Sequence, residues 1–348
     1  MSQEERMLIL NMVAGGKISA EQGAELLKAL ERSRVTDDYE VEYEAEGIEA
    51  EGDGEKTDET GERSREARRP VRGRSLLEEL LEGLTAGGLG FFGPNYHLEE
   101  ELVGTFDASK VEIELATCNG KIAVSAHDEP GYKVILRKSV RAGSEEEAQR
   151  RAAEMVEVIT ESDRLSIITR SGWNNHGGVS VELRLPASLA YNFNLRSSNG
   201  RVEVIGLSGD KAVLRTSNGS IEIGDGTFDL VNLKTSNGSI RSACAANSLK
   251  AHTSNGSVKA LARGESDGSF DLYTSNGSIS FRTLNPSAGY RVRANTSLGR
   301  IRVELPDMDF QEMRKHRVEA SSRNYEGKSP KIEVKAQTSN GSITIGEE

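Results

Sequence analysis

Polar and apolar residues alternate along most of the chain from Leu98 onward. In the stretches 111–115 and 179–185 every second residue is aliphatic. Because successive side chains of a strand point to opposite faces, this period of two predicts strands with one buried face. One amphipathic stretch interrupts them. Ser144 followed by Glu147 has the form of a capping box and predicts a helix over 144–159 that covers the open edge of the sheet.

A short motif recurs among the predicted strands. It reads Thr-Ser-Asn-Gly-Ser-Ile or a close variant, and its asparagine returns every 18 to 21 residues before one gap of 64. A degenerate copy at 296–301 falls inside that gap, and an early copy at 117–122 stands alone. A period near 20 indicates stacked coils, because one such unit is too small to bury its own apolar face. The asparagines are Asn199, Asn218, Asn237, Asn255, Asn276 and Asn340.

The apolar positions change phase at each Asn-Gly pair. Phe193 and Leu195 lie an even number of residues before Asn199, whereas Val202 and Val204 lie an odd number after it. All four share one face only if the pair shifts the register by one residue. We attribute the shift to a turn with positive φ, which glycine adopts freely and asparagine tolerates.

Two architectures fit this pattern. In a row of β-hairpins, Asn-Gly would form the tight turn and Thr216 would lie opposite Ile221. In a β-solenoid, the pair would form a corner, and equivalent side chains would stack from coil to coil. A hairpin turn needs only Asn-Gly, so the repetition of the flanking Thr, Ser and Ile favours the solenoid, in which stacked asparagines can also hydrogen-bond. The predicted fold class is all-β, a β-solenoid of coils of about 20 residues with one capping helix, plus a small amino-terminal α-helical hairpin.

The sequence divides into four segments. Residues 1–34 predict a helical hairpin, 35–74 a charged disordered linker, 75–97 an amphipathic helix with a Gly-rich connector, and 98–348 the solenoid. A hairpin of this size rarely folds unaided, so we expect it to bind a protein partner or to self-associate. The leucine-rich stretch within 75–92 has a glutamate polar face that anionic lipid repels, which makes membrane contact the less favoured interpretation.

Composition narrows the functional classes. The net charge of −11 argues against nucleic acid as a partner. Two cysteines form no disulfide framework, and the first residues lack the pattern of a secretory signal. We therefore expect a cytoplasmic protein, with a peripheral position at the cell envelope as the alternative.

The repeats and the amino-terminal segment together resemble known bacterial proteins. Residues 98–348 resemble the "putative adhesin" domain-of-unknown-function family, whose members carry such repeats in a β-solenoid. Residues 4–30 look like the short helical amino-terminal domain of YvlB-like proteins. The resemblance implies a link to the bacterial cell envelope and its stress responses. It implies no reaction and no catalytic residues.

Basic residues recur three positions before successive asparagines. Stacking would align them into a stripe that could meet an anionic envelope polymer, although neighbours such as Glu203 and Glu222 are expected to neutralise it in part and a solvated face is the alternative. The serine-rich corners could also meet glycans. The stripe comprises Arg196, Arg215, Lys234 and His252.

Signs of catalysis are weak. The five histidines have no partner at metal-ligand spacing, and the glycines of 88–93 lack the strand and helix of a dinucleotide site. We expect no catalytic residue, cofactor or metal, and a non-enzymatic interaction or scaffold protein linked to the envelope or to envelope-stress signalling. The alternative is a polysaccharide-active solenoid enzyme, glycosidase or lyase, which would need carboxylates converging on one face.

Overall fold

The computed structural model describes residues 94–170 and 177–348. The chain separates into two compact units, 1–71 and 72–348, and the fold below belongs to the second. The helical hairpin of 1–34, the linker of 35–74 and the leucine-rich helix expected within 75–92 lie outside the described residues.

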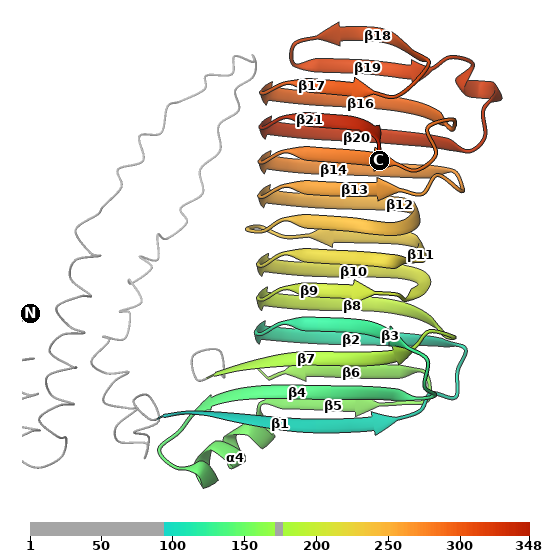
Figure 1. Cartoon of the computed structure of the whole chain (residues 1–348). Helices are drawn as coiled ribbons and strands as arrows, with labels where there is room; N and C mark the ends of the chain where they lie inside the picture. The colour runs from blue at the N-terminus through green and yellow to red at the C-terminus, as the bar shows by residue number, and fades with distance from the viewer. Residues whose placement is uncertain (1–93, 171–176) are drawn as a thin grey trace, which may run out of the picture. The chain divides into compact units, whose positions relative to one another are not determined.

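Each coil of the solenoid has two strands joined at a corner, which is Asn-Gly in every coil except that of β16 (Gly289–Leu298) and β17 (Ile301–Glu304), where it is Leu298-Gly299 (Figure 1). The strand before the corner pairs in parallel with its equivalents in neighbouring coils, and these strands form what we call the pre-corner sheet. Its strands are β2 (Lys110–Asn119), β8 (Ala190–Asn199), β10 (Ser208–Asn218), β14 (Gly268–Asn276), β16 (Gly289–Leu298), β20 (Lys331–Asn340) and the later parts of β11 (Ile221–Lys234) and β12 (Ile240–Asn255).

The strands after the corners form a second parallel layer, the post-corner sheet. The long strands β11 and β12 begin in this layer and continue into the pre-corner sheet, so the two layers share one hydrogen-bonded network. The other strands of the post-corner sheet are β3 (Ile122–His127), β9 (Val202–Ile205), β13 (Val258–Ala262), β15 (Ile279–Thr283), β17 (Ile301–Glu304) and β21 (Ile343–Glu347).

The coils stack with equivalent residues in register. Asn218 pairs with Asn199 in the pre-corner sheet, and Ile221 pairs with Val202 in the post-corner sheet. Strands on either side of a corner thus pair with the next coil and not with each other, as a hairpin would require. The predicted solenoid is confirmed.

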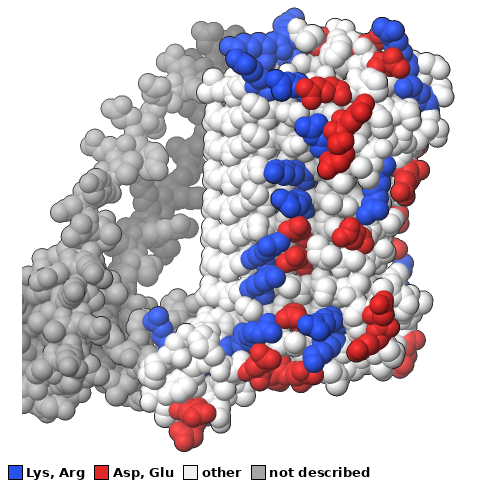
Figure 2. Space-filling model, viewed as in Figure 1, with Lys and Arg blue, Asp and Glu red and all other residues white. Residues whose placement is uncertain are grey.

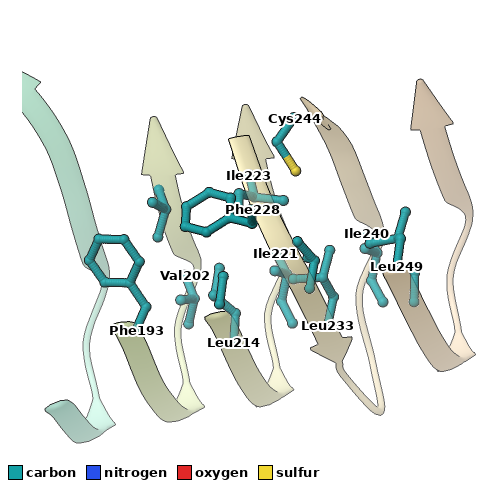
Figure 3. Close-up of a cluster of buried hydrophobic side chains, with 14 of the residues drawn as sticks. Phe193, Val202, Leu214, Ile221, Ile223, Phe228, Leu233, Ile240, Cys244 and Leu249 are labelled. Atoms are coloured by element: carbon teal, nitrogen blue, oxygen red, sulfur yellow. The ribbon is translucent and has the colours of Figure 1, made fainter. Parts of the chain in front are cut away.

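The core lies between the two sheets. Leu214 and Leu233 point inward from one sheet and Val202, Ile221 and Ile240 from the other (Figure 3). Each is at most 1% exposed. Burial of this apolar surface between neighbouring coils is the main force that holds the stack together, since no single coil encloses a core.

At the first end of the solenoid, antiparallel strands continue both sheets beyond the first coil. In the post-corner sheet β3 pairs with β7 (Gly177–Pro186), β7 with β4 (Tyr132–Arg141), and β4 with β1 (Asn95–Gly104). In the pre-corner sheet β2 pairs with β6 (Arg164–Thr169), and β6 with β5 (Val156–Thr160). The early copy of the motif therefore does not stand alone, because β2 and β3 place it beside the coil of Asn199.

The predicted helix is real but shorter than expected. Helix α4 spans Glu145–Glu154, and its cap Ser144 accepts a hydrogen bond from the backbone N–H of Glu147 at 3.2 Å. It contacts β1, β4 and β5, the first and last of which are edge strands. The predicted continuation to residue 159 is wrong, because residues 156–160 form β5 and hydrogen-bond to β6.

The other end departs from the order of the sequence. The coil of β20 and β21 lies between the coil of β14 and β15 and the coil of β16 and β17, which both precede it in the chain (Figure 1). Between β17 and β20 the chain forms the hairpin β18 (Met308–Arg314) and β19 (Arg317–Ser322) and the 3-10 helix η2 (Tyr325–Gly327). Strand β19 pairs antiparallel with β16 and covers the end of the pre-corner sheet.

Candidate functional site

The corner asparagines form a hydrogen-bonded column along one edge of the solenoid. Each side-chain amide donates from Nδ2 to the Oδ1 of the preceding asparagine in the stack, at 2.7 to 2.9 Å. The column begins at Asn119 and includes all six asparagines that the repeat predicts. It ends where Leu298 occupies the next position beside Asn340.

The buried threonines of the motif form a second column behind the first. Thr216, for example, donates from Oγ1 to the carbonyl oxygen of Gly200 in the neighbouring coil at 3.0 Å, and the pattern repeats at the next corners. A buried hydroxyl needs such a partner, so these bonds explain why the motif retains threonine.

The corner glycines are required for two reasons, of which only the first was predicted. At three corners Gly256, Gly277 and Gly299 have positive φ angles of 152° to 157°, a conformation that other residues rarely adopt, whereas among the described residues no corner asparagine has positive φ. Each corner glycine also lies against the next coil. A Cβ on Gly219 would lie 2.1 Å from the carbonyl oxygen of Gly200, and one on Gly238 would lie 2.0 Å from that of Gly219. The predicted positive φ is therefore present in the glycine at three corners, and close approach of the backbones is a further requirement that the sequence did not show.

Three basic side chains from the predicted stripe lie side by side on the outer face of the pre-corner sheet. Arg196, Arg215 and Lys234 are register partners in β8, β10 and β11. All three are exposed. Adjacent strands lie about 4.8 Å apart, so this cationic column extends over about 10 Å. No ion pair connects any of the three to another residue of 94–170 or 177–348.

The carboxylates expected to neutralise these cations lie on the other sheet. Glu203 in β9 forms an ion pair with Lys121 at 3.0 Å, and Glu222 in the first part of β11 pairs with Arg201. The corner turns the chain between them and the cationic column. On the same three strands the next residues of this face are uncharged: Asn194, Val213, Asn232, Ser198, Ser217 and Ser236. On the adjacent strand β2, Glu114 lies beside Asn194 and forms an ion pair with Arg164.

The fourth member of the predicted stripe has different surroundings. His252 follows Lys234 in register, but its Nε2 lies 3.6 Å from a carboxylate oxygen of Asp271 and has no hydrogen-bond partner. The ring of Tyr273, on the next coil, contacts the imidazole edge to face at 5.7 Å. Of the four members of the predicted stripe, Arg196, Arg215 and Lys234 are therefore the three with no carboxylate beside them among the described residues.

The outer face of the post-corner sheet carries a shallow hollow of about 360 Å³. Ser220, Ser239 and Ser257 lie on three successive coils and line it together with Arg201, Glu222, Arg241 and Lys259. Figure 2 shows how charged side chains follow columns along the solenoid, beside an edge without charge. Sequence reasoning considered the corner serines but missed Arg241 and Lys259, whose recurrence four positions after the asparagine was the available signal.

Carboxylates stack at one place on this face. Glu203 and Glu222 are register partners on adjacent coils, and both are held in ion pairs. Glycoside hydrolysis needs one carboxyl group that donates a proton, whereas a carboxylate bound to arginine or lysine acts as an acceptor. Within residues 94–170 and 177–348, no group of three or more His, Cys, Asp or Glu side chains is placed to hold a metal ion.

The stacked coils, the hydrogen-bonded corner column and the periodic outer faces define a β-solenoid repeat protein. The family is shown by the sequence itself, because residues 108–346 match the Toastrack DUF4097 family. The chain belongs to that family. Residues 4–34 match a SHOCT-like domain, in agreement with the predicted short amino-terminal domain.

The chain is also similar to several solved bacterial structures, at low sequence identity. A "putative cell adhesion protein" from Clostridium sporogenes is 14% identical, with a TM-score of 0.35, covering 73% of this chain and 100% of that one. A "putative adhesin" from Bacteroides fragilis is 13% identical, with a TM-score of 0.37 and coverages of 72% and 96%. A "putative lipid binding protein" from Parabacteroides distasonis is 11% identical, with a TM-score of 0.25 and coverages of 74% and 98%. No curated protein matches the chain.

Within the described residues, no helix has the length and apolar character of a membrane-spanning segment.

Proposed function

We propose that this protein is a non-enzymatic scaffold of the bacterial cell envelope whose cationic column binds a linear anionic polymer. The observation that carries the proposal is the row formed by Arg196, Arg215 and Lys234, for which no ion pair is seen in the part of the chain that the structure describes. Like charges at this spacing repel one another, and a polymer with closely spaced anionic groups relieves that repulsion while it lies along the solenoid.

The test compares two variants that remove the same charge. Replacing Arg196, Arg215 and Lys234 together by Gln should weaken binding of a glycerol-phosphate polymer at low salt by about 30-fold, since three exposed charge contacts contribute about 2 kcal/mol in total. The control replaces Arg300, Arg302 and Arg314 by Gln, three arginines at the far end of the solenoid. Binding is measured by fluorescence anisotropy of the labelled polymer.

The control variant should retain nearly the affinity of the unmodified chain. Equal losses in both variants would mean that net charge alone governs binding and would overturn the role of the column. Tighter binding of single-stranded DNA than of the envelope polymer would also count against the proposal, because the chain as a whole is acidic.

The amino-terminal unit supplies the second part of the proposal. We expect residues 1–34 to bind a protein partner or a second copy of the chain. The solenoid would then bind the polymer through its cationic column, while the hairpin of 1–34 binds a partner in envelope-stress signalling. Deleting 1–34 should abolish recovery of the partner in a pull-down and leave the strand-type circular dichroism intact. Unchanged recovery would contradict this role.

The alternative function, a polysaccharide-active enzyme, predicts a different result. It would release reducing ends from envelope glycans, and the release would be lost in a Glu203→Gln, Glu222→Gln variant, which removes the stacked carboxylates of the post-corner face. The scaffold should release none. Cell fractionation gives a further test, since the scaffold is expected with the envelope and not in the soluble pool.

A further inference from the structure

The hollow on the post-corner sheet combines free hydroxyls with incompletely neutralised cations. Ser220, Ser239 and Ser257 recur once per coil, about 4.8 Å apart. Ser257 Oγ donates a hydrogen bond to Ser239 Oγ at 3.1 Å. Because Ser239 is the acceptor in this bond, its own hydroxyl proton can be donated to a ligand. The Ser220 hydroxyl has no partner among the described residues. The hollow therefore offers both donors and acceptors to a polar ligand.

The charges around the hollow are uneven along the stack. Arg201 is held by Glu222 and by Glu203, the latter at 3.5 Å. One end is thus neutral. At the other end Arg241 and Lys259 are register partners on adjacent coils. Arg241 reaches Glu222 only at 4.0 Å with its side chain 61% exposed, and no ion pair involves Lys259 within the described ranges. This end carries an excess of positive charge.

The size of the hollow limits the ligand. Its volume of about 360 Å³ is at the lower end of the range for sites that hold small molecules. No aromatic ring lines it, so binding depends on hydrogen bonds and charge rather than on stacking. A long polymer would not be enclosed, whereas a single sugar unit would occupy the three coils.

We propose that this hollow is a binding site for a small polyhydroxylated ligand that carries one anionic group, of the sugar-phosphate or sugar-acid class. The anionic group lies between Arg241 and Lys259, and the ligand hydroxyls exchange hydrogen bonds with Ser220 and Ser239. The site is separate from the cationic column, because the two lie on opposite sheets of the same coils. The protein would then recognise a polymer on one face and a terminal sugar unit on the other.

The experiment titrates the full chain with glucose 6-phosphate, glucuronate, glucose and inorganic phosphate, followed by calorimetry or NMR. Glucose 6-phosphate and glucuronate should bind at least tenfold more tightly than glucose or phosphate. A preference between them identifies whether phosphate or carboxylate is the natural anionic group. The Arg241→Gln, Lys259→Gln variant should bind both acidic sugars with at least tenfold lower affinity.

A second pair of variants separates a built site from general attraction to cations. Ser220→Val with Ser239→Val fills the hollow and removes its hydroxyls without changing charge, and it should abolish the advantage of the acidic sugars over phosphate. The Arg215→Gln, Lys234→Gln variant should bind acidic sugars normally while binding the polymer more weakly. Equal binding of phosphate and glucose 6-phosphate, or no effect of the serine changes, would overturn this proposal and leave the polymer site untouched.

Discussion

The corner glycines are the residues at which the stack tolerates the least change. An added methyl group at Gly238 would lie 2.0 Å from the carbonyl oxygen of Gly219, which belongs to the rigid backbone of the next coil. Neither atom can move without disturbing the asparagine and threonine columns on either side.

Gly238→Ala should therefore lower the free energy of unfolding by about 3 kcal/mol or more, because the coils must separate to admit the methyl group. Equilibrium unfolding in urea measures the loss. Gly224→Ala is the matched control, since its Cβ would meet only side-chain carbons at 3.5 and 3.9 Å, an ordinary contact. Equal destabilisation by both changes would show that contact with the next coil is not what makes the corner glycine necessary.

Leu298 ends the asparagine column and offers a way to lengthen it. Its side chain is 67% exposed and lies beside Asn340, whose Oδ1 receives no hydrogen bond from a described residue. Leu298→Asn should add one donor to the column and raise the free energy of unfolding by about 1 kcal/mol, as judged from the urea midpoint. Leu298→Asp introduces a side chain of the same shape as asparagine but without an amide donor, and it should not raise the free energy of unfolding. A gain from both would attribute the effect to removal of an exposed leucine.

At the scale of the strand and helix, much of the architecture follows from periodicity. The alternation around each corner predicts which side chains face the core, and Phe193, Leu195, Val202 and Val204 are all buried as expected. The end of α4 was not predictable in the same way. The valines at 156 and 158 fit both the stripe of a helix and the alternation of a strand, and only pairing with β6 decides between them.

The surface sites were predictable only in part. Register placed Arg196, Arg215 and Lys234 in one column, since identical corners align the residues at a fixed distance before them. The separation of Glu203 and Glu222 from that column was missed because the sequence does not show how sharply the corner turns. Contacts between coils, which create the hollow and fix the glycines, are long-range and leave no local signal.

At the scale of the whole solenoid, the repeated motif does not predict the order in which the last coils stack. Equivalent corners can stack on any neighbour, so the motif does not specify that residues 331–347 lie between two earlier coils. The coil of β20 and β21 is thereby the hydrogen-bonding partner of both β14 and β16 in one sheet and of β15 and β17 in the other.

Ending the chain at Pro330 should release the coils beyond β15. The truncation removes Ile332, Val334, Ile343 and Ile345, each at most 1% exposed, whose burial contributes about 6 to 12 kcal/mol. Hydrogen exchange should show protection lost in β16 to β19 and kept in β8 to β13. Removing only Glu347 and Glu348, which are exposed, should leave the protection of both groups of strands unchanged. Retained protection in β16 and β17 after the longer truncation would show that this coil docks directly on β14 and β15.

The inserted coil also has a consequence for synthesis on the ribosome. Coils up to β13 meet their partners in the order in which they are translated, so they can assemble while the chain is still growing. Residues 289–322 are synthesised before residues 331–347, which separate them from β14 in the folded protein. Until residues 331–347 are synthesised, the strands of 289–322 either remain without their parallel partner or pair with a non-native strand. A translation arrest in this interval would leave two bare strand edges open to association with other chains.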